Sequence, residues 1–142
     1  MTATALPRDE LLALLNVLLE SERAGSRALA AWRREPPPGV DPALIEHVAR
    51  DEARYCTGLT RQIKRLGGEP SHATGAFFHK IMGLPDWPAR FRLLDRGQRW
   101  VADRISETLP KVANDADLTA FLTEMRDTHM VNIESCAKVA PT

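Results

Sequence analysis

Apolar side chains recur at intervals of three and four residues over four long stretches of the chain. This spacing is typical of helices that bury one face. The four stretches cover residues 9–34, 42–66, 87–110 and 118–136. Alternation with a period of two, which would indicate β-strands, is not seen. The pattern therefore predicts an all-α protein with four long helices.

Residues with strong backbone preferences mark the ends of these helices. The run Glu35-Pro36-Pro37-Pro38-Gly39 ends the first helix, because proline lacks an amide donor and disfavours helical geometry in the residue before it. Asp41-Pro42 and Asp86-Trp87-Pro88 each place a capping carboxylate before a first-turn proline. Gly67 and Gly68 end the second helix. The first two helices are thus joined by a short connection.

The connection between the second and third helices is much longer. Residues 67–88 contain three prolines and four glycines, although residues 73–82 can form a short helix that packs against the others. A long link lets the third helix start at the end of the bundle where the second helix began. We therefore expect an antiparallel four-helix bundle with one long crossover, as in ferritin-like folds.

The size and charge of the chain indicate a single domain and argue against some classes of partner. A chain of 142 residues with 44% hydrophobic residues is long enough to bury one core, so we expect residues 1–142 to form a single domain. The 19 basic and 19 acidic side chains cancel, and no net field favours nucleic acid or anionic lipid. We expect neither nucleic acid nor a membrane as partner.

Cysteine usage and the N-terminal residues indicate a cytoplasmic location. Cys56 and Cys136 are far apart and fit no metal or redox motif, so we expect reduced, partly buried thiols. Residues 1–7 lack the basic and apolar regions of an export signal. No stretch approaches the roughly 18–20 apolar residues that span a bilayer.

Each long helix carries a polar residue near the middle of its apolar face. These residues are Glu22, Glu52, Gln98 and His129. A buried carboxylate is costly unless it is paired, protonated or bound to a metal. One interpretation is a metal site, because carboxylates and imidazole suit iron, manganese or zinc. The other is a metal-free polar network in which the glutamates pair with Arg126 or bond to Tyr55, Gln98 and Asn132.

Asp51 and His47 precede Glu52 on the second helix. Asp51 lies about 100° away from the inward stripe, so we expect it to face solvent or to pair with an arginine. His47 lies four residues earlier, a spacing that usually gives a contact on the helix surface.

The four central positions resemble part of the ligand set of ferritin-like di-iron proteins. Those proteins place Glu on helix 1, Glu-x-x-His on helix 2, Glu on helix 3 and Glu-x-x-His on helix 4. Glu22 matches the first position, Glu52-Ala-Arg-Tyr55 has Tyr in place of His, and Gln98 replaces the third Glu. Arg126-Asp-Thr-His129 keeps the His but has Arg in place of Glu.

Four longer strings resemble those of a bacterial ferritin-like family that has no established reaction and is distantly related to rubrerythrins. They are Leu19-Glu-Ser-Glu-Arg-Ala-Gly25, Asp51-Glu-Ala-Arg-Tyr-Cys56, Leu66-Gly-Gly-Glu-Pro-Ser71 and Arg96-Gly-Gln-Arg-Trp-Val101. The resemblance runs through most of the chain and implies a ferritin-like fold and a cytoplasmic location.

The incomplete ligand set predicts at most one transition-metal ion. Glu22, Glu52 and His129 could hold it, with Tyr55 and Gln98 as nearby or weak ligands. A di-iron oxidase is not expected, because two ions need about four carboxylates. Arg126 could instead balance the glutamates in a metal-free structural or interaction module, which we expect to form a homodimer. Neither interpretation assigns a reaction.

Overall fold

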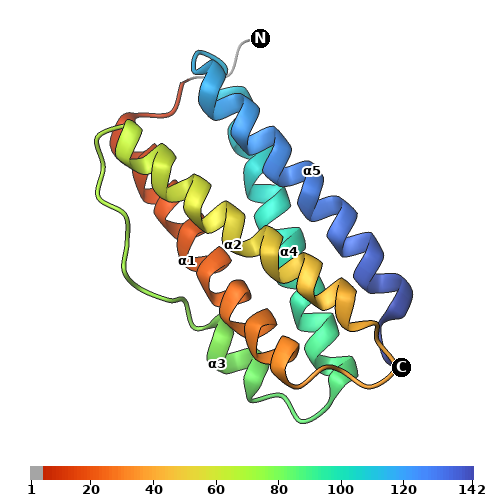
Figure 1. Ribbon diagram of the computed structural model, residues 1–142. Helices are drawn as coiled ribbons and strands as arrows, with labels where there is room; N and C mark the ends of the chain where they lie inside the picture. The colour runs from red at the N-terminus through yellow and green to blue at the C-terminus, as the bar shows by residue number, and fades with distance from the viewer. Residues whose placement is uncertain (1–4) are drawn as a thin grey trace.

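The computed structural model of the protein describes residues 5–142, and every regular element in that range is a helix (Figure 1). Residues 1–4, which include part of the segment where we expect no export signal, lie outside the described range. The elements are α1 (Arg8–Arg34), α2 (Pro42–Arg65), α3 (Phe77–Met82), α4 (Trp87–Thr108), the 3₁₀ turn η1 (Leu109–Lys111) and α5 (Ala116–Val139). The predicted all-α class and four long helices are confirmed.

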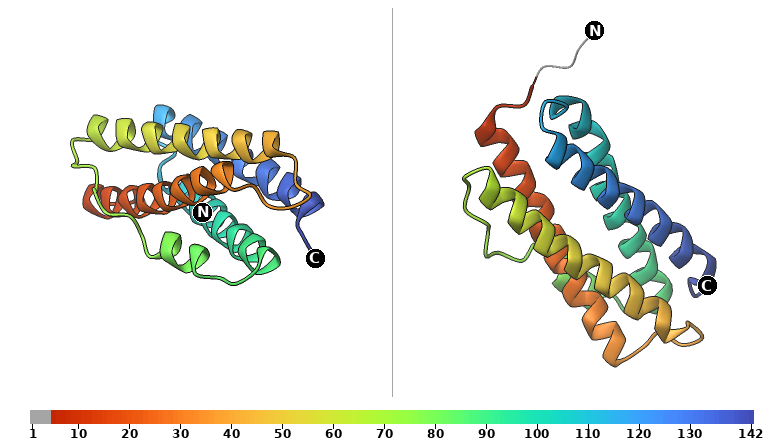
Figure 2. Two further views of the ribbon diagram at one scale, coloured as in Figure 1. Left: turned by 60° about the horizontal axis from the view of Figure 1, so that its bottom comes forward. Right: turned by 45° about the horizontal axis from the view of Figure 1, so that its top comes forward.

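The four long helices form an antiparallel bundle. α1 packs mainly against α2, and α4 packs mainly against α5. The crossover leaves the end of α2 and runs along the outside of the bundle to α3 at the opposite end (Figure 1). There α3 contacts both α1 and α4, while α1 and α4 meet only loosely (Figure 2). The expected single crossover with a short helix is therefore present.

None of the helices within residues 5–142 combines the length and the apolar character that a membrane span requires.

Aspartate side chains begin three of the long helices. Asp41, Asp86 and Asp115 each accept a hydrogen bond from a backbone amide in the first turn of the helix that follows. Gly67, with a φ of 82°, provides the left-handed residue that follows the end of α2. The predicted end signals at Asp41, Asp86 and Gly67 are therefore present, and Asp115 is a further cap.

The crossover is tied to α1 through its backbone. Asn16 donates to the carbonyl of Glu69 and accepts from the amide of Ser71. The Arg23 guanidinium donates to the carbonyls of Ser71 and Ala73. These bonds hold residues 69–73 beside α1 in a non-helical path, so the short helix begins at Phe77 and not at the predicted residue 73.

The apolar core is divided into two clusters along the bundle axis. One cluster includes Leu15, Leu19, Tyr55, Ile63 and Leu122, and the other includes Leu29, Trp32, Ile45, Phe91 and Leu94. The level between them holds the polar side chains of Glu22, Glu52, Gln98 and His129, which are also buried. A polar layer therefore separates the two apolar clusters.

Replacing Asp115 by alanine is expected to lower the free energy of unfolding by about 1 kcal/mol at pH 7. The carboxylate caps α5 through the Leu118 amide at 3.1 Å and pairs with Arg65 at 2.7 Å. The Arg65 bond lowers the pKa of Asp115 below its ordinary value of 3.8. The ion-pair contribution is therefore present above that pH and lost as pH falls through the lowered pKa.

Urea unfolding at several pH values measures this effect. Asp115→Asn keeps the capping oxygen and separates the cap from the ion pair, while Asp86→Ala removes a cap that has no ion pair among the described residues. Equal stability of Asp115→Ala and the wild type at pH 7 would contradict the assignment.

Candidate metal centre

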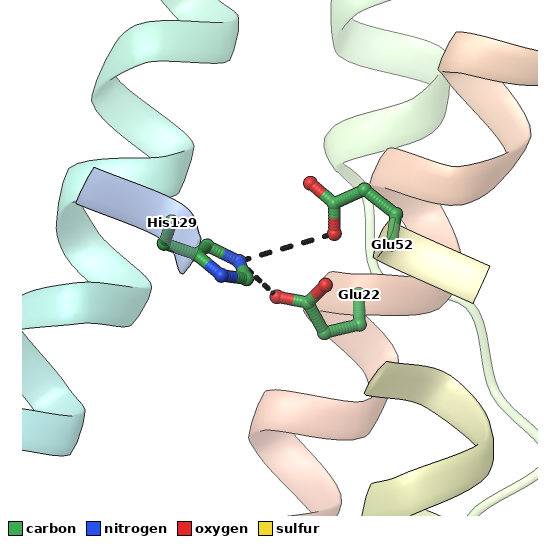
Figure 3. Close-up of side chains that lie close together, drawn as sticks. All are labelled: Glu22, Glu52 and His129. Atoms are coloured by element: carbon green, nitrogen blue, oxygen red, sulfur yellow. Dashed lines mark hydrogen bonds and ion pairs between the residues drawn. The ribbon is translucent and has the colours of Figure 1, made fainter. Parts of the chain in front are cut away.

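Three helices bring Glu22, Glu52 and His129 together in the polar layer (Figure 3). The imidazole Nε2 of His129 lies 2.6 Å from Oε1 of Glu22 and 3.9 Å from Oε2 of Glu52. One ligand atom from each residue lies within 4.8 Å of the other two, and no residue of the three is more than 4% exposed. α1, α2 and α5 each contribute one residue.

A backbone bond within α5 orients the imidazole. Nδ1 of His129 lies 2.9 Å from the carbonyl oxygen of Met125, one helical turn earlier. Because a carbonyl oxygen can only accept, Nδ1 carries a proton and donates it. Nε2 therefore faces the two carboxyl groups. A histidine that binds a metal through one nitrogen usually donates from the other in this way.

The carboxyl groups retain protons to an unusually high pH. Burial raises the pKa of Glu22 to about 7. Burial, together with the negative charge of Glu22, raises the pKa of Glu52 well above its ordinary value of 4.5. The short contact between Nε2 and Glu22 holds one proton, on either the imidazole or the carboxyl group. Within residues 5–142, the site has no nearby positive charge to stabilise ionised carboxylates, so the carboxyl groups stay protonated to a higher pH.

Three oxygen atoms in the layer are buried without a hydrogen-bond partner among the described residues. They are Oε2 of Glu22, Oε2 of Glu52 and Oε1 of Gln98. Gln98, on α4, donates from Nε2 to Oε1 of Glu52 at 3.3 Å. An unpaired buried acceptor costs about 1–3 kcal/mol. All four long helices thus contribute to the layer, which has more acceptors than donors when its two carboxyl groups are ionised.

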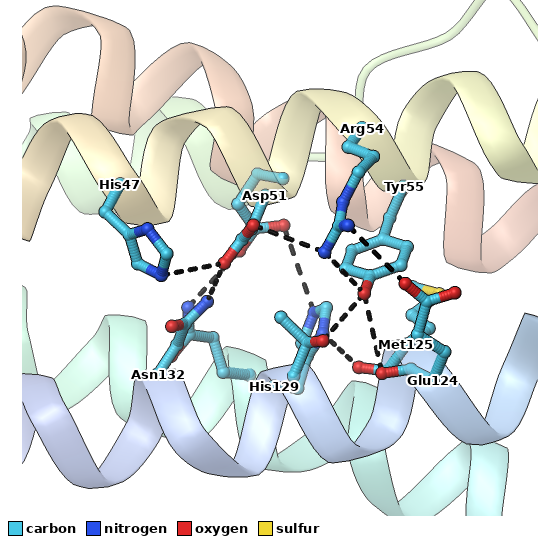
Figure 4. A network of polar contacts seen from close by, with 11 residues as sticks. His47, Asp51, Arg54, Tyr55, Glu124, Met125, His129 and Asn132 are labelled. Carbon is cyan, nitrogen blue, oxygen red and sulfur yellow. Dashed lines mark hydrogen bonds and ion pairs between the residues drawn. The ribbon is translucent and has the colours of Figure 1, made fainter.

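Tyr55 and Arg126 do not take the places suggested by the ferritin-like pattern. The Tyr55 hydroxyl contacts Thr128 Oγ1 at 2.7 Å and accepts from Arg54, so it points into the groove between α2 and α5 (Figure 4). The ring of Tyr55 lies near the His129 ring, but its hydroxyl does not reach the site. Arg126 donates to Asp127 at 3.2 Å and its side chain is 31% exposed. The expected contact between Arg126 and a buried carboxylate is not formed.

Asp51 belongs to a separate polar network along this α2–α5 groove (Figure 4). It accepts from Asn132 at 3.0 Å and pairs with Arg54, and His47 lies 3.4 Å from it. The predicted arginine pairing of Asp51 and the surface contact of His47 are therefore present. Asn132 is buried, but its amide group bonds to Asp51 and is not directed at the glutamates. This network links α2 to α5 and makes no hydrogen bond to Glu22, Glu52 or His129.

A cavity of about 410 Å³ lies between α1, α3 and α4, and it reaches Glu22, Glu52 and His129. This cavity was not predicted from the sequence. Gly25 and Gly97 line it within helices, where glycine costs about 1 kcal/mol relative to alanine. A Cβ atom at Gly97 would lie 2.9 Å from the Phe77 ring, and one at Gly25 would lie 3.3 Å from Glu52. In the sequence, the cavity could have been inferred only from these two glycines, which lie within helices at the level of the polar layer.

Comparisons with known proteins identify a family for this chain and a solved structure with a similar fold. Residues 9–138 match the family model described as a domain of unknown function (DUF6306). The structure titled "Crystal structure of ferritin like, diiron-carboxylate proteins from Bacillus anthracis str. Ames" aligns with a TM-score of 0.72 and 17% identity. The alignment covers 93% of this chain and 94% of that one, which shows a shared fold. No curated protein matches the chain. The chain therefore belongs to the DUF6306 family, and it shares the fold of that ferritin-like protein.

Proposed function

We propose that this protein binds a single divalent transition-metal ion, iron, manganese or zinc, through Glu22, Glu52 and His129. The observation that carries the proposal is the excess of buried acceptors, with two carboxyl oxygens unpartnered beside an imidazole nitrogen. A cation there would replace the proton between His129 and Oε1 of Glu22 and would bind the free Oε2 of Glu52.

The separations of the three groups are compatible with one ion. Two ligand atoms held about 2.1 Å from a tetrahedral ion lie roughly 3.4 Å apart. The observed distances from Nε2 to the two carboxylates, 2.6 and 3.9 Å, lie on either side of that value. Held by Glu22, Glu52 and His129, an ion would have fewer than four protein ligands and would supply Lewis-acid chemistry.

A second ion does not fit the residues present. The similar structure is titled a di-iron carboxylate protein, and two ions need bridging carboxylates and further ligands. Here Gln98 is a neutral amide, the Tyr55 hydroxyl bonds to Thr128, and Arg126 pairs at the surface. We therefore propose a mononuclear site and not a di-iron oxidase.

The alternative is a metal-free module stabilised by a polar network. An arginine in contact with a buried glutamate would support this alternative, but Arg126 pairs with Asp127. The bond between Gln98 and Glu52 is the feature that still favours this alternative. It leaves three buried oxygens unpartnered, so we place it second.

Titrating chelator-treated protein with Co²⁺, followed by visible absorption, tests the proposal. We expect one equivalent to bind, and removing one ligand by Glu22→Gln, Glu52→Gln or His129→Ala should weaken binding at least 100-fold, since even loss of outer-shell partners costs 10–100-fold. Elemental analysis of protein purified without chelator or nickel resin identifies the native ion.

Two variants separate this site from surface binding. His47→Ala removes an exposed histidine, and Glu134→Gln makes the carboxyl-to-amide change at an exposed position of α5. Both should bind Co²⁺ like the wild type. Unchanged binding in all three ligand variants, or substoichiometric iron, manganese and zinc in wild type and Glu52→Ala alike, would overturn the proposal.

We further propose that the protein acts in a reducing compartment such as the cytoplasm. Cys56 and Cys136 are free thiols. Burial, and then the charges of Glu22 and Glu52, raise the pKa of Cys56 to about 12, and burial raises that of Cys136 to about 11. Such thiols stay protonated at neutral pH and are poor nucleophiles.

We also propose that the protein assembles as a homodimer, which light scattering would test.

A further inference from the structure

The cavity beside the polar layer has the composition of a small-molecule site. Its volume of about 410 Å³ is within the range of ligand pockets, and its walls are mainly apolar. Phe77 comes from α3, and Leu93, Leu94 and Val101 come from α4. The loose contact between α1 and α4 leaves this space, and the absence of side chains at Gly25 and Gly97 keeps it open.

Positive charge also lines the cavity. Lys80 on α3 and Arg96 on α4 both line it, and both are exposed. Neither has an ion-pair or side-chain hydrogen-bond partner within residues 5–142, although many other arginines of the protein pair with a carboxylate. Because the protein has no net charge, any preference for an anion must come from such local groups.

The inner end of the cavity has a different character. Glu22, Glu52, Gln98 and His129 line it there, and Oε1 of Gln98 is buried without a partner among the described residues. An anionic group buried at this end would lose its hydration beside two carboxyl groups, whereas the two cations at the exposed end attract it. A ligand with an apolar body and one anionic group therefore has a single favourable orientation.

We propose that the cavity binds a small amphipathic carboxylate, with its carboxylate at Lys80 and Arg96 and its apolar body directed towards Glu22, Glu52 and His129. Binding itself requires only the apolar walls and the two cations. The consequence that the body of the ligand faces a metal ion rests on the proposed function of the polar layer.

Calorimetric titration with octanoate and with 1-octanol tests the site. The two probes share an apolar chain and differ in charge. We expect octanoate to bind with one-to-one stoichiometry and five- to tenfold more tightly than octanol, the range that two exposed ion pairs provide. Acetate, which has the charge without the chain, should not bind measurably.

Two variants locate the binding. Lys80→Gln/Arg96→Gln should weaken octanoate five- to tenfold and leave octanol unchanged, whereas the control Lys64→Gln/Arg92→Gln removes two exposed charges outside the cavity and should change neither. Gly97→Leu fills the cavity and should abolish binding of both probes. Its thermal melting curve shows whether it remains folded, and the double variants alter only exposed positions.

Metal-free and Co²⁺-loaded protein are both titrated, which keeps the two proposals distinguishable. Octanoate binding without Co²⁺ binding would leave the cavity proposal standing and reject the metal site. Co²⁺ binding without octanoate binding would reject the cavity proposal alone. Equal octanoate affinity in wild type and Lys80→Gln/Arg96→Gln, or in wild type and folded Gly97→Leu, would also overturn it.

Discussion

Metal-free protein carrying Glu52→Gln is expected to be more stable than metal-free wild type at pH 7.5, by about 1–3 kcal/mol, the cost of a buried acceptor without a partner. The wild-type carboxyl group is buried beside Glu22, and both influences raise its pKa. Folding above the ordinary pKa therefore requires the group either to take up a proton or to carry an unpaired buried charge. Glutamine avoids this cost and can still accept the bond from Gln98 through its Oε1.

The pH dependence follows from the direction of the shifts. Between pH 4.5 and about 7 the unfolded chain releases the Glu22 proton while the folded protein retains it. The unfolded state is therefore favoured as pH rises, and Glu22 alone removes on the order of 3 kcal/mol across this window. Glu52 shifts in the same direction. Metal-free wild type should lose stability from pH 5 to 7.5, and Glu52→Gln should lose less.

Urea unfolding of chelator-treated proteins at pH 5.0 and 7.5 measures both effects. Glu134→Gln, the same chemical change on the exposed face of α5, should follow the wild type at both pH values. Addition of Co²⁺ should reverse the order, because the wild type gains more binding free energy than the variant. A metal-free wild type that is more stable than Glu52→Gln at pH 7.5 would show that the buried carboxyl group is not a liability.

Replacing Trp32 by alanine is expected to reduce the free energy of unfolding by about 3–5 kcal/mol. Trp32 is 1% exposed at the end of α1 and stacks on Phe91 with ring centroids 5.4 Å apart. Trp87 makes a T-shaped contact with it, with ring centroids 5.2 Å apart. Both partners belong to the first turns of α4, so the substitution removes the contact that fixes the start of this helix on α1.

Two substitutions set the scale for this effect. Trp32→Phe keeps an aromatic ring and removes the indole Nε1, which has no hydrogen-bond partner among the described residues. It should cost much less than alanine. Trp100→Ala removes the same residue type at a position that is 40% exposed and should cost clearly less than Trp32→Ala. Equal losses for Trp32→Ala and Trp100→Ala would contradict this role for Trp32.

The fold could be predicted from the sequence because its signals are local and agree with one another. Asp41, Asp86 and Gly67 mark helix ends through bonds and dihedral angles that involve only nearby residues. The start of α3 was misplaced because it depends on Arg23, which lies about 50 positions away in the chain. A residue pattern cannot show that a distant guanidinium occupies the carbonyl groups of a segment.

The same distinction applies to the polar layer. Glu22, Glu52 and His129 could be selected because helical periodicity places each on a buried face, where a polar residue is unusual. Periodicity gives a direction around one helix but not the side chains it meets on the next. Tyr55 was placed beside the glutamates, yet its hydroxyl reaches Thr128 across the α2–α5 groove. The cavity depends on the spacing of α1 and α4, which single helices do not specify.

The attachment of the crossover to α1 bears on how this chain can diverge. Asn16 and Arg23 contact only carbonyl and amide groups of residues 69, 71 and 73, atoms that almost every amino acid supplies. Substitutions at those three crossover positions should leave its route around the bundle unchanged. The contact depends instead on the polar side chains at positions 16 and 23. We expect homologues to keep polar residues there, while the sequence of the crossover varies.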